Sequence, residues 1–123
     1  ADRAAAALPA PAPTPLPFAG VLGPLRDGMG QAVRNGTAGI LRGLPFPVMA
    51  KTGTAEDPAS PNGDTDSWMI AVAPAEDPAV VFASFVRGGG HGGTTSGPVV
   101  KQALQYFADH RPDILTTGPA PAP

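Results

Sequence analysis

The prolines of this chain gather at its two ends, and this limits where a folded core can form. Proline lacks a backbone N–H donor and fixes φ, so it is excluded from the interiors of helices and sheets. The two proline-rich ends contain Pro9, Pro11, Pro13, Pro15 and Pro17, and Pro119, Pro121 and Pro123. We therefore expect an extended Pro/Ala-rich segment over residues 1–17, a folded part over 18–113 and a flexible tail over 114–123.

The rest of the composition excludes several classes of protein. The formal net charge is −2 at pH 7, without a run of like charges, so we expect no nucleic-acid partner. Cysteine is absent and no metal-ligand spacing is present, so we expect neither a metal nor another cofactor. No apolar run approaches the roughly 20 residues of a membrane span. The chain start looks like an internal segment of a longer protein, so any membrane anchor would lie outside this chain.

Apolar residues at helical spacing predict two helices. The first is expected over about Pro24 to Asn35, where Leu22, Leu25, Met29 and Val33 would form one apolar stripe. The second is expected to begin at Ser96-Gly97-Pro98 and to end at His110-Arg111-Pro112. A flexible glycine-rich connection over residues 88–93 would precede it.

Three short apolar runs predict strands. They cover residues 48–55, 68–73 and 79–86. The segment 56–66 is rich in turn residues, and we expect a loop there. Neither of the last two runs alternates cleanly, so we expect helices to cover both faces of the sheet. Trp68, Phe82 and Phe85 would then lie in its core.

The most informative residues are Lys51-Thr52-Gly53 on the first predicted strand. Lysine offers a cation, threonine a hydroxyl that can bind a carboxylate, and glycine lets a substrate approach the backbone. An extended peptide can then pair with the free strand edge. The alternative is a solvated edge strand whose exposed lysine discourages aggregation, and the tripeptide alone favours this alternative.

The surrounding residues extend the pattern. Residues 51–56 form K-T-G-T-A-E, Asn35-Gly36-Thr37-Ala38 precedes them, and Ser67-Trp68 follows. In this order and spacing, the chain resembles the class B penicillin-binding proteins over about Leu22 to Phe107. The resemblance implies an α/β fold of the penicillin-binding and serine β-lactamase type, an antiparallel sheet flanked by helices. This chain would supply three strands, one flanking helix and the C-terminal helix.

The resemblance also implies roles for individual residues. Lys51 would be catalytic, because it would lie beside the reactive serine and its proton network. Thr52, Gly53 and Thr54 would bind substrate, with the two hydroxyls holding the carboxylate of a stem peptide or of a β-lactam. The backbone amide of Thr54 would be one of two oxyanion-hole donors, so Thr54 is a catalytic candidate as well.

The nucleophile of that family belongs to a Ser-x-x-Lys motif, which this chain lacks. Its two lysines, Lys51 and Lys101, have Val48 and Pro98 three positions earlier. The second family motif, Ser-x-Asn, has a match at Ser60-Pro61-Asn62, but this match follows Lys51 and lies in a turn-rich loop. We interpret it as a turn and expect both motifs in an N-terminal part of the same protein.

The function that the resemblance implies is that of a bacterial peptidoglycan D,D-transpeptidase, a serine acyl-enzyme that cross-links the cell wall and binds penicillin. Its partners would be the N-terminal part of the protein, the peptidoglycan stem peptide and β-lactam antibiotics. The site would face outward from the cytoplasmic membrane, and this chain would be inactive alone. The alternatives are a related serine acyl-enzyme, such as a β-lactamase, a D,D-carboxypeptidase or a β-lactam sensor, and a non-catalytic module that keeps the fold.

Overall fold

The computed structural model describes residues 12, 14, 15 and 17–116. The elements are η1 (Ala19–Val21), α1 (Leu22–Arg34), η2 (Gly39–Leu41), β1 (Met49–Glu56), β2 (Thr65–Ala73), β3 (Val80–Val86), α2 (Ser96–His110) and α3 (Pro112–Thr116). The two predicted helices and three predicted strands are confirmed, in the predicted order. Most of the predicted N-terminal segment, and residues 117–123 of the predicted tail, lie outside the described residues.

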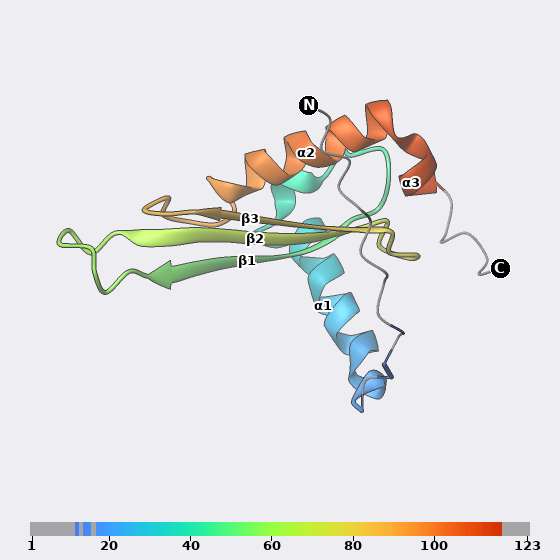
Figure 1. Cartoon of the computed structure of the whole chain (residues 1–123), viewed down its shortest axis with the longest axis horizontal. Coiled ribbons are helices and arrows are strands. Elements are labelled where there is room, and N and C mark those ends of the chain that lie inside the picture. Colours follow the sequence, from blue (N-terminus) through green and yellow to red (C-terminus); the bar gives the residue numbers. More distant parts are fainter. Residues whose placement is uncertain (1–11, 13, 16, 117–123) are drawn as a thin grey trace, which may run out of the picture.

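The three strands form one antiparallel sheet in the order β1-β2-β3. Helix α2 lies along one face of this sheet and contacts β2 and β3, whereas α1 contacts β1 and projects from the other side (Figure 1). Short loops over residues 57–64 and 74–79 join the strands, so each strand pairs with its neighbour in the sequence. The expected α/β arrangement of an antiparallel sheet with helices is confirmed.

The core lies between the sheet and α2. Alternate residues of β2 point toward the helix, and Met69, Ala71 and Ala73 are fully buried there. Val100 and Leu104 of α2 meet them and are also fully buried. Burial of a side chain of this size contributes about 1.5–3 kcal/mol, so this layer holds the chain together.

The opposite face of the sheet corrects the expectation that both faces are covered. Trp68 and Ile70 of β2 are 40% and 43% exposed, and Phe85 of β3 is 49% exposed. Trp68 and Phe85 pack against each other with ring centroids 4.4 Å apart, instead of lying in the core. Phe82 alone of the three predicted core aromatics packs toward α2, edge-on to Phe107. We call the exposed apolar surface of Trp68, Ile70, Val81 and Phe85 the open face.

Helix α1 buries less of its predicted apolar stripe than expected. It extends from Leu22 to Arg34 with Asn35 as its C-cap, within two residues of the predicted bounds. Pro24 fits in the first turn, where backbone N–H groups lack an intrahelical partner. Val33 is buried against the core, but Leu25 is exposed. Of the stripe residues, only Val33 is buried, whereas Leu22 and Met29 are half-buried.

Besides η1, two further short elements were not predicted. Helix η2 brings Leu41 into the core, where it is almost fully buried. Helix α3 takes in Leu115, which the sequence analysis placed in a flexible tail, and this leucine is 4% exposed. One buried leucine in a run of a few residues gives no periodic signal, so neither element could be read from spacing.

Candidate active site

Strand β1 distributes the predicted site residues over both faces of the sheet. Lys51 pairs with Ile70 of β2 and so belongs to the open face. Thr52 and Thr54 pair with Met69 and Ser67, on the face that carries α2. The four residues Lys51 to Thr54 thus lie together on an outer strand of the sheet, but Lys51 and the two threonines project in opposite directions.

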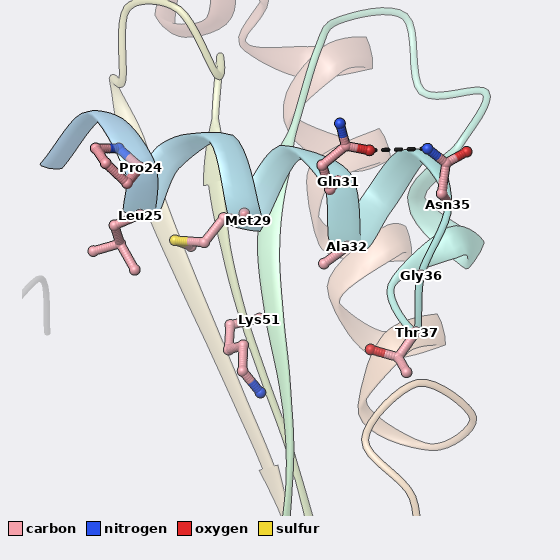
Figure 2. Close-up of a pocket in the computed structure, with 10 residues that line it drawn as sticks. Pro24, Leu25, Met29, Gln31, Ala32, Asn35, Gly36, Thr37 and Lys51 are labelled. Atoms are coloured by element: carbon pink, nitrogen blue, oxygen red, sulfur yellow. Dashed lines mark hydrogen bonds between the residues drawn. The ribbon is translucent and has the colours of Figure 1, made fainter. Parts of the chain in front are cut away.

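A hollow of about 620 Å³ lies between Lys51 and helix α1. Leu25 and Met29 of α1 point into this hollow from above, and Lys51 projects from β1 below them (Figure 2). The Lys51 side chain is exposed, and its ammonium group donates a hydrogen bond to the carbonyl oxygen of Thr52. The cation therefore stays at the edge of the sheet.

A second hollow, of about 440 Å³, lies on the other side of β1. The hydroxyl groups that line it belong to Thr37, Thr52, Thr54 and Thr94, and Arg42 and His91 lie beside them. Such a set of hydroxyl donors with a guanidinium nearby suits a carboxylate or another small anion. The two predicted substrate-binding hydroxyls therefore share one polar hollow.

Thr37 is a further candidate residue of this site that the sequence did not predict. Its hydroxyl lies 2.6 Å from the hydroxyl of Thr52, and it lines both hollows. The sequence shows Thr37 only as part of a turn after a helix. No periodicity links two residues in different elements, so only the fold reveals this contact.

The glycine-rich loop over residues 88–93 is packed against the site, which corrects the expectation of a flexible connection. A Cβ atom at Gly92 would lie 2.2 Å from the carbonyl oxygen of Trp68 and 2.7 Å from that of Gly53. A Cβ atom at Gly93 would lie 2.4 Å from the carbonyl oxygen of Thr37. These glycines let the loop touch the backbone of β1 and β2 directly.

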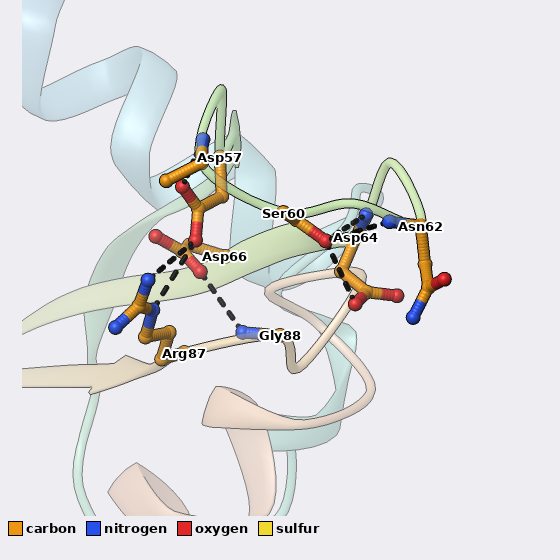
Figure 3. Close-up of polar contacts among 8 residues, drawn as sticks. Asp57, Ser60, Asn62, Asp64, Asp66, Arg87 and Gly88 are labelled. Atoms are coloured by element: carbon orange, nitrogen blue, oxygen red, sulfur yellow. Dashed lines mark hydrogen bonds and ion pairs between the residues drawn. The ribbon is translucent and has the colours of Figure 1, made fainter.

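The loop between β1 and β2 confirms that Ser60-Pro61-Asn62 is a turn. The hydroxyl of Ser60 accepts hydrogen bonds from the backbone N–H groups of Asn62 and Asp64 at 3.3 and 3.1 Å, and it donates to the Asp64 carboxylate (Figure 3). Gly63 has a φ of +69°, as such a turn requires. Ser60 is thus committed to holding the loop.

An ion pair ties this loop to the end of β3. Arg87 donates two hydrogen bonds to one carboxylate oxygen of Asp57, at 3.1 and 3.2 Å (Figure 3). The backbone N–H of Ala59 and the Arg87 guanidinium hold the pKa of Asp57 below its usual range. Asp57 therefore remains a carboxylate at neutral pH and ties the loop to the end of β3.

Two features are absent from the described part of the chain. Within residues 17–116, no three His, Asp or Glu side chains gather in a way that could hold a metal ion. Over the same described part of the chain, no helix combines the length and apolar character that a membrane crossing needs.

Comparison with known proteins gives consistent matches. Residues 19–105 match the family model of the penicillin-binding protein transpeptidase domain. A stretch of 63 residues is 41% identical to the peptidoglycan D,D-transpeptidase PbpA of Mycolicibacterium smegmatis, and it covers 46% of this chain and 13% of that protein.

Two solved structures share this arrangement. One is the D,D-transpeptidase domain of a peptidoglycan glycosyltransferase from Eggerthella lenta, with 37% identity and a TM-score of 0.54 over 68% of this chain and 20% of that one. The other is penicillin-binding protein A from M. tuberculosis as a ceftriaxone acyl-enzyme complex, with 26% identity and a TM-score of 0.61 over 75% of this chain and 21% of that one. The chain thus spans between 13% and 21% of the length of these relatives.

Proposed function

This chain belongs to the penicillin-binding protein transpeptidase family, and we propose that it supplies the substrate-binding strand of a bacterial peptidoglycan D,D-transpeptidase. The observation that carries the proposal is the arrangement around β1. A lysine lies on one side of an outer strand, and a group of threonine hydroxyls lies on the other. A polar hollow beside an open strand edge suits an extended peptide that ends in a carboxylate.

The backbone of β1 supports this mode of binding. In an antiparallel strand, the N–H and C=O of one residue point to the same side, and alternate residues point to the same edge. The carbonyl of Thr52 accepts a hydrogen bond from the Lys51 ammonium. This supports the view that the N–H and C=O of Thr52 point away from β2, toward the free edge of β1. The N–H of Thr54, two residues later, would then point to the same edge. The Thr54 amide would then donate to the oxyanion of the substrate.

The hydroxyl groups would hold the carboxylate of the substrate. Thr52 and Thr54 would donate to the C-terminal carboxylate of a stem peptide or to the carboxylate of a β-lactam. Thr37 would support them, because its hydroxyl lies 2.6 Å from that of Thr52 and so limits the directions in which Thr52 can donate. That the similar protein from M. tuberculosis forms an acyl-enzyme with ceftriaxone supports the β-lactam as a ligand.

The nucleophilic serine would come from an N-terminal part of the same protein that carries Ser-x-x-Lys and Ser-x-Asn. Lys51 acts in this mechanism beside the serine, so that part would approach the side of the sheet on which Lys51 lies. This side carries the open face, where Trp68, Ile70 and Phe85 offer apolar surface to a second layer. The chain spans 13–21% of the length of these relatives, so a complete protein of their length would have a large further part that could cover this face.

The reaction would proceed in two steps. The serine oxygen attacks the peptide carbonyl, the terminal residue leaves as an amine, and an ester joins the serine to the remaining peptide. An amine from a second peptide then displaces the serine and forms the cross-link. Lys51 would stabilise the charge that develops beside the serine, and the site would work outside the cytoplasmic membrane, where the cell wall is built.

The test is the acylation rate of the complete protein with a fluorescent penicillin, measured for Lys51→Ala. A charge-assisted hydrogen bond contributes about 1.5–3 kcal/mol, so we expect acylation to slow by about 10- to 150-fold. The acylation rate should fall far more than the melting temperature, because Lys51 would act by its charge and is not part of the buried core. Thr54→Pro should slow acylation further, since it removes the predicted oxyanion donor.

Lys101→Ala is the matched control, because Lys101 is the other lysine of the chain and lies on α2. It should acylate at the parental rate. If Lys51→Ala also acylates at that rate, β1 is only a solvated edge strand and the proposed function is wrong. A complete protein that hydrolyses penicillin quickly would instead point to a β-lactamase.

A further inference from the structure

Two buried serines are joined by hydrogen bonds directly behind the predicted oxyanion donor. Ser67 lies on β2 opposite Thr54, and Ser96 is the first residue of α2. Both residues are completely buried. Burial of a hydroxyl group costs free energy unless the group forms a hydrogen bond, so the hydrogen bonds of this pair matter for the core.

The hydrogen bonds between the serines form a consistent set. The backbone N–H of Ser96 donates to the hydroxyl oxygen of Ser67 at 3.1 Å, and the Ser67 hydroxyl donates to that of Ser96 at 2.8 Å. The Ser96 hydroxyl in turn donates to the backbone carbonyl of Ser67 at 3.0 Å. Each hydroxyl donates once in this set, so all three bonds form together and fix the start of α2 to β2.

The same junction holds the glycine-rich loop against the site. The Ser67 hydroxyl also lies 3.3 Å from the carbonyl oxygen of His91, and the backbone N–H of Gly97 donates to the carbonyl of Gly92 at 2.9 Å. Gly92 is packed on the backbone of Gly53, where a Cβ atom would be only 2.7 Å from the carbonyl oxygen. A continuous line of contacts therefore runs from the serine pair, through the loop, to the residue before Thr54.

We propose that Ser67 and Ser96 are positioning residues that set the place of the Thr54 amide and of the loop wall beside Thr52. The inference rests on the proposed function, because it assigns the pair to the accuracy of that same site. Neither serine touches the substrate. Packing is dense at Gly92, so a displacement of the loop reaches the backbone of β1 directly. A small misplacement of a group that acts in the transition state lowers the rate of reaction more than it lowers binding.

The experiment uses the complete protein and separates binding from acylation. Stopped-flow kinetics with a fluorescent penicillin give the dissociation constant of the first complex and the acylation rate constant for Ser67→Ala, Ser96→Ala and the double variant. We expect the acylation rate constant of each single variant to fall about tenfold, with the dissociation constant within about twofold. The double variant should be no slower than the slower single variant, because the two serines act as one unit.

Ser84→Ala is the matched control, because Ser84 is also a buried serine but lies on β3, opposite Met69. It should acylate at the parental rate. Ser67→Cys replaces the hydroxyl with a somewhat larger thiol that is a weaker donor and leaves no cavity, so it tests the idea even if Ser67→Ala fails to fold, and it should also acylate more slowly.

The outcomes distinguish the inference from its premise. An acylation rate constant within twofold of the parent in Ser67→Cys and in the folded alanine variants overturns the positioning role, whatever the melting temperatures are. A fall no larger than that of Ser84→Ala overturns it as well. A parent protein that never acylates overturns the proposed function itself, and the inference with it.

Discussion

The two faces of the sheet are completed to different degrees by the described residues. On the face toward α2, Met69, Ala71 and Ala73 are fully buried. On the open face, the intervening Trp68 and Ile70 retain a large part of their exposure, although they are at least as apolar as their neighbours. Strand β2 therefore contributes to a buried core on one side and to an exposed apolar surface on the other.

The candidate site divides along the same line. Thr52, on the face toward α2, has a fixed neighbour in the hydroxyl of Thr37 and a polar hollow walled by the glycine-rich loop. Lys51, on the open face, has a hollow lined by apolar side chains of α1, and its ammonium contacts the backbone of its own strand. The chain thus holds the part of the site that would bind a carboxylate in place, whereas the part around Lys51 depends on what covers the open face.

The largest effect is expected when the open face is left uncovered. The chain of residues 1–123, prepared alone, should form no acyl adduct with penicillin, whereas the complete protein should form one, seen by intact mass spectrometry. It should also lack a sharp cooperative melt, because three strands with one bare apolar face are marginally stable. A stable adduct on any of its serines, or a sharp melt of the monomer, would contradict the claim that the open face and the site around Lys51 are incomplete in this chain alone.

A smaller effect should separate adjacent residues of β2 in the complete protein. Met69→Ala should cost about 2–5 kcal/mol of unfolding free energy, because Met69 is fully buried under α2. Ile70→Ala should also cost more than about 1 kcal/mol if another part of the protein covers the open face. The measurement is urea unfolding of both variants. A cost below about 0.5 kcal/mol for Ile70→Ala would show that this face stays in water.

The smallest effect concerns the loop between β1 and β2, which lies at one end of the sheet and belongs to neither face. The pKa of Asp57 is lower in the folded state than in the unfolded chain, so its ionised carboxylate stabilises the folded state at pH values above the ordinary pKa of Asp. This contribution is lost as the pH falls through the pKa of the folded state. Asp57→Asn should therefore be less stable than the parent at pH 7, and the difference should shrink below about pH 4. Urea unfolding at both pH values measures it, with Asp27→Asn on α1 as the control. A difference that does not depend on pH would remove the ion pair from the explanation.

The sequence predicted the order of elements because each signal is local. The apolar runs, the turn residues of the loop after β1 and the helix start at Ser96-Gly97-Pro98 all lie within a few residues of the feature that they predict. The K-T-G-T-A-E motif lies on one strand, so its existence and its exposure at an edge followed from the same local pattern.

The remaining features depend on contacts between distant segments. The pairing of Thr37 with Thr52 requires the turn after α1 to lie beside β1, which neither segment encodes alone. The exposure of Trp68 and Phe85 in this chain was not predicted. The sequence shows that a residue is apolar, but it does not show which segment of the protein covers it. The packing of Gly92 was missed because a run of glycines looks flexible unless the surface that it touches is known.

The pairing of each strand with its neighbour in sequence has a consequence for how the chain assembles. Joining β1 to β2 and β2 to β3 closes only short loops, so the sheet can form quickly, before contacts with remote segments are made. Until those contacts form, the outer edges of β1 and β3 and the open face can meet other copies of the chain. Lys51 places a charge on the outer strand β1, and a charge at such a position discourages strands of separate molecules from adding on. The lysine that is proposed to act in catalysis would therefore also protect the newly made sheet from aggregation.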